Sequence, residues 1–177
     1  MRVAYQGVPG AFSHEACLTF MPEYEAMGEP TFEAVVEVVA LGEKDYGVLP
    51  LENSAVGPVE GVAELIAAAP VEIVARHSLP IRLHLLGLPG TDISTVTTAV
   101  SHPMALKQCA RTLAELGLAA QPAINTAVAA QSLADPASAV LASEAAAEAY
   151  GLAILRRDVQ DHRENATIFA VIAKRGR

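Results

Sequence analysis

Short apolar runs alternate with longer segments of helical periodicity along the chain. The apolar runs predict β-strands at residues 2–5, 46–49, 71–78, 80–88, 96–100, 119–124, 139–142, 152–155 and 167–173. Segments with apolar residues three or four positions apart predict helices at residues 13–20, 31–41, 59–69, 101–116, 126–133 and 143–150. This alternation of strands and helices is typical of an α/β fold.

Cap and turn residues set the expected ends of these elements. Ser13, Thr31, Thr126 and Ser143 are predicted helix N-caps because a hydroxyl can accept a backbone N–H of the first turn. Gly42 is expected to end its helix. Pro50 is expected to end a strand, and residues 52–58 are expected to form a loop. The two halves of the pattern meet near residues 78–80, which favours two lobes around a ligand cleft.

Composition narrows the class of protein. Hydrophobic residues make up 52% of the chain and charged residues 18%, which argues against disorder. The net charge is −8 with 12 Lys+Arg and no basic run, so no nucleic-acid partner is expected. No stretch of about 18 apolar residues predicts a membrane span, and the N-terminus lacks the apolar core of a signal peptide. We therefore expect a cytoplasmic protein without disulfides, and the histidine spacing predicts no metal site.

Four polar segments stand where strands are expected to lead into helices. They are residues 7–13, 50–54, 101–103 and 125–126. Helix N-termini carry free N–H groups and a partial positive charge, so such segments can hold an anion. Each segment taken singly is more often an ordinary helix cap or turn than a ligand contact. Their recurrence favours a small anionic ligand.

Five segments resemble motifs of the prephenate dehydratase family, in the family's order. They are residues 7–13 (GVPGAFS), 46–57 (YGVLPLENSAVG), 101–109 (SHPMALKQC), 125–130 (NTAVAA) and the closing stretch 150–169, which includes Asp161 and Asn165. The resemblance implies a single catalytic domain over residues 1–177 with a two-lobed fold of the type II periplasmic-binding-protein kind. Lobe one would span about 1–78 and lobe two about 79–165, with strand 167–173 returning at the hinge and the ligand cleft between the lobes.

The resemblance also implies an activity and a site. The family converts prephenate to phenylpyruvate, water and CO2 in phenylalanine biosynthesis. Gain of aromaticity drives the reaction, so no cofactor and no metal are expected. Thr167 matches the threonine of the family's Thr-Arg-Phe motif, which serves the departing hydroxyl, here as an oriented donor. Asn53 and Gln108 match family positions tied to substrate binding and catalysis, where a side-chain amide can donate to a carboxylate or a hydroxyl. Glu52 matches a carboxylate that we expect to be protonated or to orient a neighbouring group.

Further residues are candidates for substrate binding, and a homodimer is expected. The candidates are Ser13, Ser54, Ser101, His102, Asn125, Thr126 and Phe169.

The chain departs from the family pattern at several positions. Ile168 replaces the arginine of Thr-Arg-Phe, which could have paired with a carboxylate. Candidate compensating cations are Arg163, Arg76 and Lys107. Other departures are Met104 for glutamine, and Val8 and Ala11 for a proline and a hydroxyl residue. No Glu-Ser-Arg-Pro motif of the family's ACT regulatory domain is present up to Arg177, so either a stand-alone or a truncated catalytic domain is expected.

Three functions remain open at this point. The first is prephenate dehydratase, favoured by Glu52, Asn53, Gln108 and Thr167 occurring together. The second is an arogenate dehydratase or a non-aromatising prephenate decarboxylase, and Thr167 argues against the decarboxylase because that reaction needs no leaving-group donor. The third is a non-catalytic anion-binding module, favoured by Ile168.

Overall fold

The computed structural model describes residues 1–162 and 164–176 and divides into two compact units. The first unit comprises Met1–Val8, Phe12–Ile81 and Glu164–Arg177, and the second comprises Pro9–Ala11 and Arg82–Arg163. Arg163, a candidate cation, lies outside the described residues, as does the terminal Arg177. Each unit is assembled from segments that are distant in the sequence.

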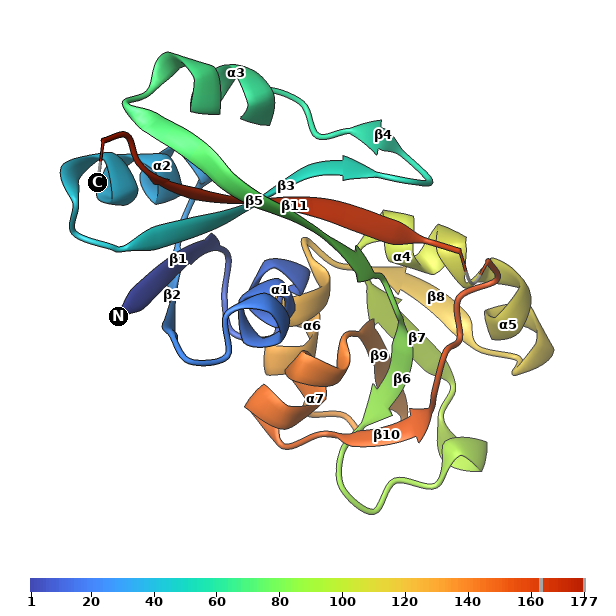
Figure 1. Cartoon of the computed structure of the whole chain (residues 1–177). Helices are drawn as coiled ribbons and strands as arrows, with labels where there is room; N and C mark the ends of the chain where they lie inside the picture. The colour runs from blue at the N-terminus through green and yellow to red at the C-terminus, as the bar shows by residue number, and fades with distance from the viewer. Residues whose placement is uncertain (163, 177) are drawn as a thin grey trace. The chain divides into compact units, whose positions relative to one another are not determined.

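The first unit is a mixed sheet with helices on both faces (Figure 1). Its elements are β1 (Arg2–Gln6), α1 (Phe12–Phe20), β2 (Glu25–Glu29), α2 (Phe32–Leu41), β3 (Tyr46–Asn53), β4 (Gly57–Pro58), α3 (Val62–Ala68), β5 (Val71–Pro80) and β11 (Ala166–Lys174). The strand order is β2-β1-β3-β11-β5, and β4 pairs with β3 outside this path. β1 runs parallel to β2 and β3, whereas β11 runs antiparallel to β3 and β5.

Consecutive residues of β11 are buried on opposite faces of this sheet. Ala170 and Ile172 pack with α2 and α3 on one face. Phe169 and Val171 pack with α1 on the other. Because helices cover both faces, β11 is apolar at successive positions rather than at alternate ones.

The second unit also pairs a mixed sheet with helices (Figure 1). Its elements are β6 (His84–Gly87), the 3-10 helix η1 (Ile93–Thr95), β7 (Thr98–Ser101), α4 (Pro103–Gln108), α5 (Ala110–Glu115), β8 (Ala119–Pro122), α6 (Thr126–Gln131), β9 (Ser138–Ala142), α7 (Glu144–Tyr150) and β10 (Ala153–Arg156). The strand order is β10-β6-β9-β7-β8. β7 runs parallel to β8 and β9, and β6 runs antiparallel to β9 and β10.

The alanine-rich helix α7 anchors the segment Pro9–Ala11 in the second unit. A Cβ atom on Gly10 would lie 2.6 Å from the Cα of Ala146, so a side chain at Gly10 is excluded by backbone contact. The Ser143 hydroxyl donates to the Gly10 carbonyl at 2.7 Å, and the Tyr150 hydroxyl donates to the Pro9 carbonyl at 2.6 Å. These contacts explain why so short a segment leaves the first unit.

The α/β prediction is confirmed, and the structure corrects several element boundaries. The strand β2 was missed because its residues are polar or only half-buried. The prediction that Pro50 ends a strand is wrong, since β3 continues to Asn53. Pro50 pairs with Phe169 next to a register shift at which β3 has one extra residue, Leu51, and such a bulge tolerates a residue without an N–H. The predicted loop 52–58 is instead a hairpin of β3 and β4.

Some predicted caps are confirmed and others are wrong. Thr31 accepts the Ala34 N–H at 3.1 Å and Ser143 accepts the Ala146 N–H at 3.0 Å, while Gly42 ends α2 in the left-handed conformation. Ser13 is not a cap, because α1 begins at Phe12. The N-cap of α6 is Asn125 rather than Thr126, since the amide oxygen of Asn125 reaches the Val128 N–H at 2.7 Å.

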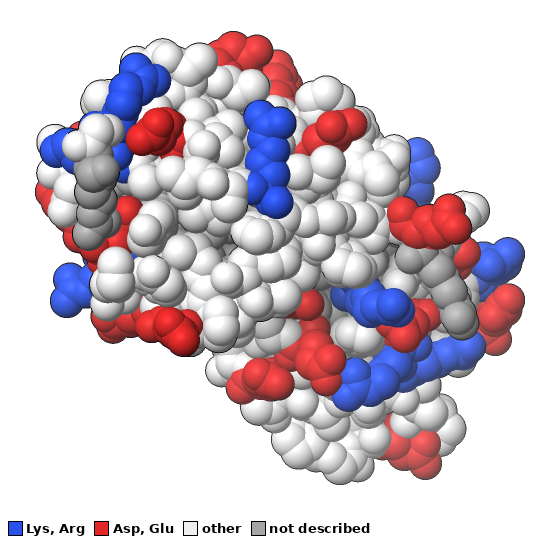
Figure 2. All heavy atoms as spheres, in the orientation of Figure 1, with Lys and Arg blue, Asp and Glu red and all other residues white. Residues whose placement is uncertain are grey.

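Acidic and basic side chains are interspersed among uncharged surface on the face drawn in Figure 2. This distribution shows no continuous basic area on that face of the described residues. None of the described helices has the length and apolarity needed to span a membrane.

A buried histidine fastens the second unit near the end of β10. His84 is 3% exposed, and its Nδ1 accepts the Asp158 N–H at 3.0 Å. Burial lowers the pKa of His84, and nearby Asp158 and Glu144 only partly oppose this shift. Asp158 itself has a φ of 52°, the left-handed region that a non-glycine residue rarely adopts. Because its Nδ1 accepts a hydrogen bond and burial lowers its pKa, the folded protein favours the neutral form of His84.

We predict that the free energy of unfolding decreases as the pH falls below about 6.5, the ordinary histidine pKa. In that range the unfolded chain binds a proton at residue 84, whereas the folded chain resists protonation until its lower pKa is reached. The measurement is urea unfolding between pH 7.5 and 5.5 for the wild type and His84→Gln. The variant should show a shallower pH dependence, with the remainder due to His14, whose pKa burial also lowers. An unchanged slope in the variant would contradict the assignment to His84.

Candidate functional site

The end of β3 and the start of β11 place three polar side chains together in the first unit. β11 pairs antiparallel with β3, and this register sets Thr167 opposite Asn53. The Asn53 Nδ2 donates to Thr167 Oγ1 at 2.9 Å and to Asn165 Oδ1 at 2.8 Å. Asn165 and Thr167 are each 7% exposed. We refer to Asn53, Asn165 and Thr167 as the amide cluster.

The hydrogen bonds of Asn53 define the direction of its amide group in the amide cluster. Its Oδ1 accepts the Ala55 N–H at 2.9 Å and the Val56 N–H at 3.2 Å, so its NH2 group faces Asn165 and Thr167. An amide N–H can only donate, and the Thr167 oxygen is therefore the acceptor. The Thr167 hydroxyl proton remains available for another acceptor. Thr167 can therefore accept from Asn53 and still donate a hydrogen bond to another group.

Asn165 was not among the predicted site residues. It lies two positions before Thr167, and residues two apart in an extended segment share a face. That spacing was the signal that could have identified it. The structure also shows a function for its backbone, since the Asn165 carbonyl accepts the Ile81 N–H at 2.8 Å.

Ser54 secures the segment that carries the amide cluster. Its hydroxyl donates to the Glu164 carbonyl at 3.1 Å and accepts the Ala166 N–H at 2.9 Å. Its own N–H donates to the Ala166 carbonyl at 2.9 Å. These three bonds hold the hairpin end against the start of β11. The structure thus gives Ser54 a local role, and its predicted role in substrate binding stays a prediction.

Glu52 and Ile168 lie opposite each other on neighbouring strands, and Ile168 is also paired with Ser78 of β5. Successive residues of a strand face opposite sides of the sheet, so Ile168 faces away from the side that carries Thr167. Ile168 is 38% exposed, and Glu52 is exposed as well. An arginine in place of Ile168 would therefore stand beside Glu52 rather than beside the Thr167 hydroxyl.

Two further predicted residues of the first unit are buried. Ser13 lies in α1 and is 8% exposed. Phe169 is 1% exposed and belongs to the core cluster packed against α1. Packing accounts for Phe169, and contact of either residue with substrate stays a prediction.

The predicted substrate-binding residues of the second unit lie at the last residue of β7 and at the starts of α4 and α6. The buried Ser101 hydroxyl donates to the Leu141 carbonyl at 2.7 Å. His102 is the N-cap of α4, where its Nδ1 accepts the Met104 N–H at 3.1 Å. Asn125 and Thr126 begin α6, with Asn125 exposed and Thr126 half-buried. Three of the four polar segments therefore adjoin a helix start, whereas residues 50–54 lie in the β3–β4 hairpin.

Gln108 is held where α4 gives way to α5. Its carbonyl accepts the Asp161 N–H at 2.7 Å. The Asp161 carboxylate in turn accepts the Arg111 N–H at 2.9 Å and the Thr112 N–H at 3.2 Å, as a cap does. Burial works against the charged form of Asp161, but these backbone bonds outweigh it and lower its pKa.

Both cysteines, Cys17 and Cys109, are buried and free. Burial raises the pKa of Cys109 to about 12, with a further contribution from Asp161. Burial raises the pKa of Cys17 to about 12 as well. Neither thiol is therefore suited to act as a nucleophile at neutral pH.

Of the candidate cations, Arg76 lies exposed on β5 of the first unit and Lys107 lies exposed on α4 of the second. Arg76 pairs with Ala170, two positions beyond Ile168 on β11. Among the described residues, no group of three or more His, Cys, Asp or Glu side chains is placed to hold a metal ion.

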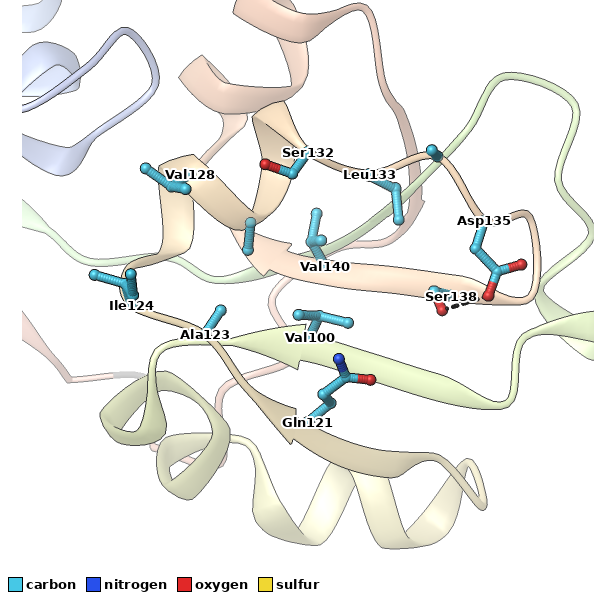
Figure 3. A pocket seen from close by; sticks show the side chains of 12 residues that line it. Val100, Gln121, Ala123, Ile124, Val128, Ser132, Leu133, Asp135, Ser138 and Val140 are labelled. Atoms are coloured by element: carbon cyan, nitrogen blue, oxygen red, sulfur yellow. Dashed lines mark hydrogen bonds between the residues drawn. The ribbon is translucent and has the colours of Figure 1, made fainter.

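A cavity of about 600 Å³ lies within the second unit (Figure 3). Its walls come from β7, β8, α6 and β9, and most of the side chains drawn are aliphatic. Ser101, Asn125 and Thr126 do not line this cavity, although their neighbours Val100 and Ile124 do.

The two mixed sheets with their helices define an α/β protein of the periplasmic-binding-protein type. The putative methionine-binding lipoprotein of Bacillus subtilis matches at a TM-score of 0.50 and 12% identity, over 99% of this chain and 83% of that chain, which shows the fold alone. The chain belongs to the prephenate dehydratase family, whose model matches residues 3–177.

Curated relatives agree with this membership, and solved structures share the fold. Arogenate dehydratase 1 of Petunia hybrida is 40% identical over 98% of this chain. A solved structure described as GqqA, a novel type of quorum quenching acylase, has a TM-score of 0.93 and 33% identity over 100% of this chain and 65% of that chain. The prephenate dehydratase of Arthrobacter aurescens, solved with L-Phe, has a TM-score of 0.88 and 24% identity over 100% of this chain and 61% of that chain, which shows the fold. The chain spans only 42% of the petunia relative.

We predict that Asp161→Ala lowers the free energy of unfolding by about 1 kcal/mol, the usual effect of losing a helix cap. The variant loses the bonds to the Arg111 and Thr112 N–H groups but keeps the backbone bond to Gln108. Chemical unfolding at neutral pH measures the loss. Asp161→Asn keeps one acceptor and should lose less, so equal losses in the two variants would contradict the capping role.

We predict that Ile168→Arg is tolerated and stabilises the first unit by about 0.5 kcal/mol, because a cross-strand pair with Glu52 becomes available. Thermal unfolding of Ile168→Arg, with and without Glu52→Gln, measures the effect. The gain should vanish in the double variant. A gain that persists without the Glu52 carboxylate would show that the pairing is not its source.

Proposed function

We propose that this chain converts prephenate to phenylpyruvate, water and CO2. One observation carries the proposal. The Asn53 amide donates to Thr167 Oγ1 and so leaves the Thr167 proton for a leaving oxygen. Family membership supports the same reaction class, since the family model spans residues 3–177.

The proposed step removes two groups from one ring. The bond between the ring carbon and its hydroxyl breaks, and the oxygen leaves with the bonding electrons. The bond between the opposite ring carbon and its carboxylate also breaks, CO2 departs, and its electron pair completes the aromatic ring. The leaving hydroxide takes up one proton in total to become water. Thr167 donates a hydrogen bond to that oxygen while its charge develops, and solvent replaces any proton that Thr167 transfers.

The surroundings of Thr167 suit a hydrogen-bond donor that lowers the barrier by its fixed position rather than by its acidity. An unperturbed threonine hydroxyl is a very weak acid, so acidity alone is a poor source of catalysis. A donor fixed in advance needs no reorganisation as the transition state forms. The two backbone bonds to Asn53 Oδ1 hold the oxygen end of the amide that donates to Thr167. Aromatisation supplies the driving force, and the reaction as proposed uses no cofactor.

Arogenate is the second candidate substrate. The observation in its favour is the petunia relative, which is named an arogenate dehydratase and is 40% identical. Arogenate carries an ammonium group where prephenate carries a keto group, and its ring chemistry is the same. The amide cluster therefore serves either substrate, and a direct comparison of turnover decides between them.

Several finer expectations belong to this proposal. The cytoplasmic location stays a prediction. So do the catalytic roles of Glu52 and Gln108. The same holds for substrate binding by four residues of the second unit, which are Ser101, His102, Asn125 and Thr126. The homodimer stays a prediction as well. Light scattering of the purified protein tests the dimer, and single alanine variants test the residues.

The first experiment incubates the purified protein with prephenate at neutral pH and quantifies phenylpyruvate, followed by arogenate with phenylalanine as the measured product. Thr167→Ala controls for spontaneous aromatisation, which acid promotes. Turnover that the variant lacks supports the proposal. Product at the variant's background level with both substrates would refute it, and fatty-acid release from an N-acyl amide would favour the acylase chemistry named for GqqA instead.

We predict that Thr167→Val lowers kcat by about 100- to 1000-fold, the range seen when a placed donor to a developing oxyanion is removed. Valine keeps the shape of threonine but lacks the hydroxyl. Thr167→Ser keeps the hydroxyl and should retain kcat within about tenfold. KM should change little in either variant. Steady-state kinetics measure both constants, and equal kcat in the valine and serine variants would contradict the donor role.

A further inference from the structure

Asn165 is buried close to Thr167, and the two side chains are linked through Asn53 rather than by a direct hydrogen bond. Its side chain carboxamide oxygen accepts one Asn53 N–H at 2.8 Å, while the second Asn53 N–H reaches Thr167 at 2.9 Å. Asn165 is only 7% exposed. Its side chain is therefore one hydrogen-bonded neighbour away from Thr167.

We propose that Asn165 is a positioning residue for the reaction proposed above, on which this inference rests. By accepting one Asn53 N–H, it fixes the plane of the Asn53 amide and directs the other N–H at Thr167 Oγ1. Thr167 is thereby held as an acceptor from Asn53, and its own proton is kept for the leaving oxygen.

The geometry of a carboxamide explains why a second acceptor matters. The torsion that rotates a terminal amide is broad, so the side chain of asparagine does not by itself select one plane. The Ala55 and Val56 N–H groups hold only the oxygen side of the Asn53 amide. Asn165 holds the nitrogen side. With contacts at both ends, the donor to Thr167 has one direction.

A purely structural role for Asn165 is distinguishable from this positioning role. The Asn165 carbonyl also accepts the Ile81 N–H at 2.8 Å, and this backbone bond survives any side-chain substitution. A side chain that only stabilised the fold would change the unfolding midpoint and leave kcat unaltered in the folded enzyme. A positioning side chain changes kcat in the folded enzyme.

The test compares Asn165→Ala with Asn165→Asp by steady-state kinetics below the unfolding temperature. Asn165→Ala removes the acceptor, and kcat should fall about tenfold or more with KM within about threefold of the wild type. Asn165→Asp keeps an acceptor oxygen, so kcat should stay within about threefold of the wild type while KM rises, because the new charge repels an anionic substrate. The control is Thr31→Ala, which loses the α2 cap and should lose stability without a change in kcat.

Unchanged kcat in Asn165→Ala, or an equal loss of kcat in both Asn165 variants, would overturn the proposal. A second measurement keeps the inference testable if the wild type turns over neither substrate. Hydrogen exchange of the Asn53 side-chain amide, observed by NMR, should show two protected hydrogens in the wild type and in Asn165→Asp. Asn165→Ala should lose protection of at least one. Equal protection in all three proteins would overturn the positioning role whatever the activity, whereas absent turnover with the expected protection would count only against the proposed function.

Discussion

The antiparallel insertion of β11 between β3 and β5 determines the rest of the first unit. β11 is the last strand of the chain, yet it pairs on both sides and lies within the sheet. Its register against β3 brings Thr167 opposite Asn53, two residues that are 114 positions apart in sequence. The same strand contributes Ala170 and Ile172 to one core and Phe169 to the other. Loss of this pairing would remove the site and both cores together.

This placement gives the amide cluster a rigid support. Asn53 stands at the last position of β3, where the hairpin turn presents the Ala55 and Val56 N–H groups to its oxygen. Thr167 stands at the second position of β11 and is held by strands on either side. A site built at the ends of paired strands keeps its geometry because neither strand can shift without breaking the sheet. Proximity catalysis requires that kind of support.

The same register shows which face of the sheet carries Ile168, the residue that replaces arginine in the Thr-Ile-Phe sequence. The alternation of a strand places Ile168 on the face opposite Thr167, next to Glu52. In the sequence motif, the replacement of arginine by Ile168 favoured a non-catalytic protein, because a cation that could pair with a carboxylate is missing. In the structure it is a change on the other face of the sheet, so the donor arrangement of the amide cluster does not depend on it. The non-catalytic alternative thereby loses its main support.

Local sequence patterns determined much of this protein. Apolar runs and caps such as Thr31 and Ser143 identified most strands and helices, because these signals act within a few residues. The motifs also identified the family. The errors arose where distant pairing overrides local preference. Pro50 continues a strand because β3 is bulged next to it while still pairing with β11, and the polar β2 is a strand because β1 lies beside it.

The pairing of strands also decided the contacts of Asn165 and the side of the sheet on which Ile168 lies. The sequence shows which residues can donate and accept hydrogen bonds, and motif comparison drew attention to Asn53 and Thr167. Only the pairing of β3 with β11 decides that Asn53 donates to Thr167 and to Asn165, because the direction of a hydrogen bond follows from which groups the fold brings within reach.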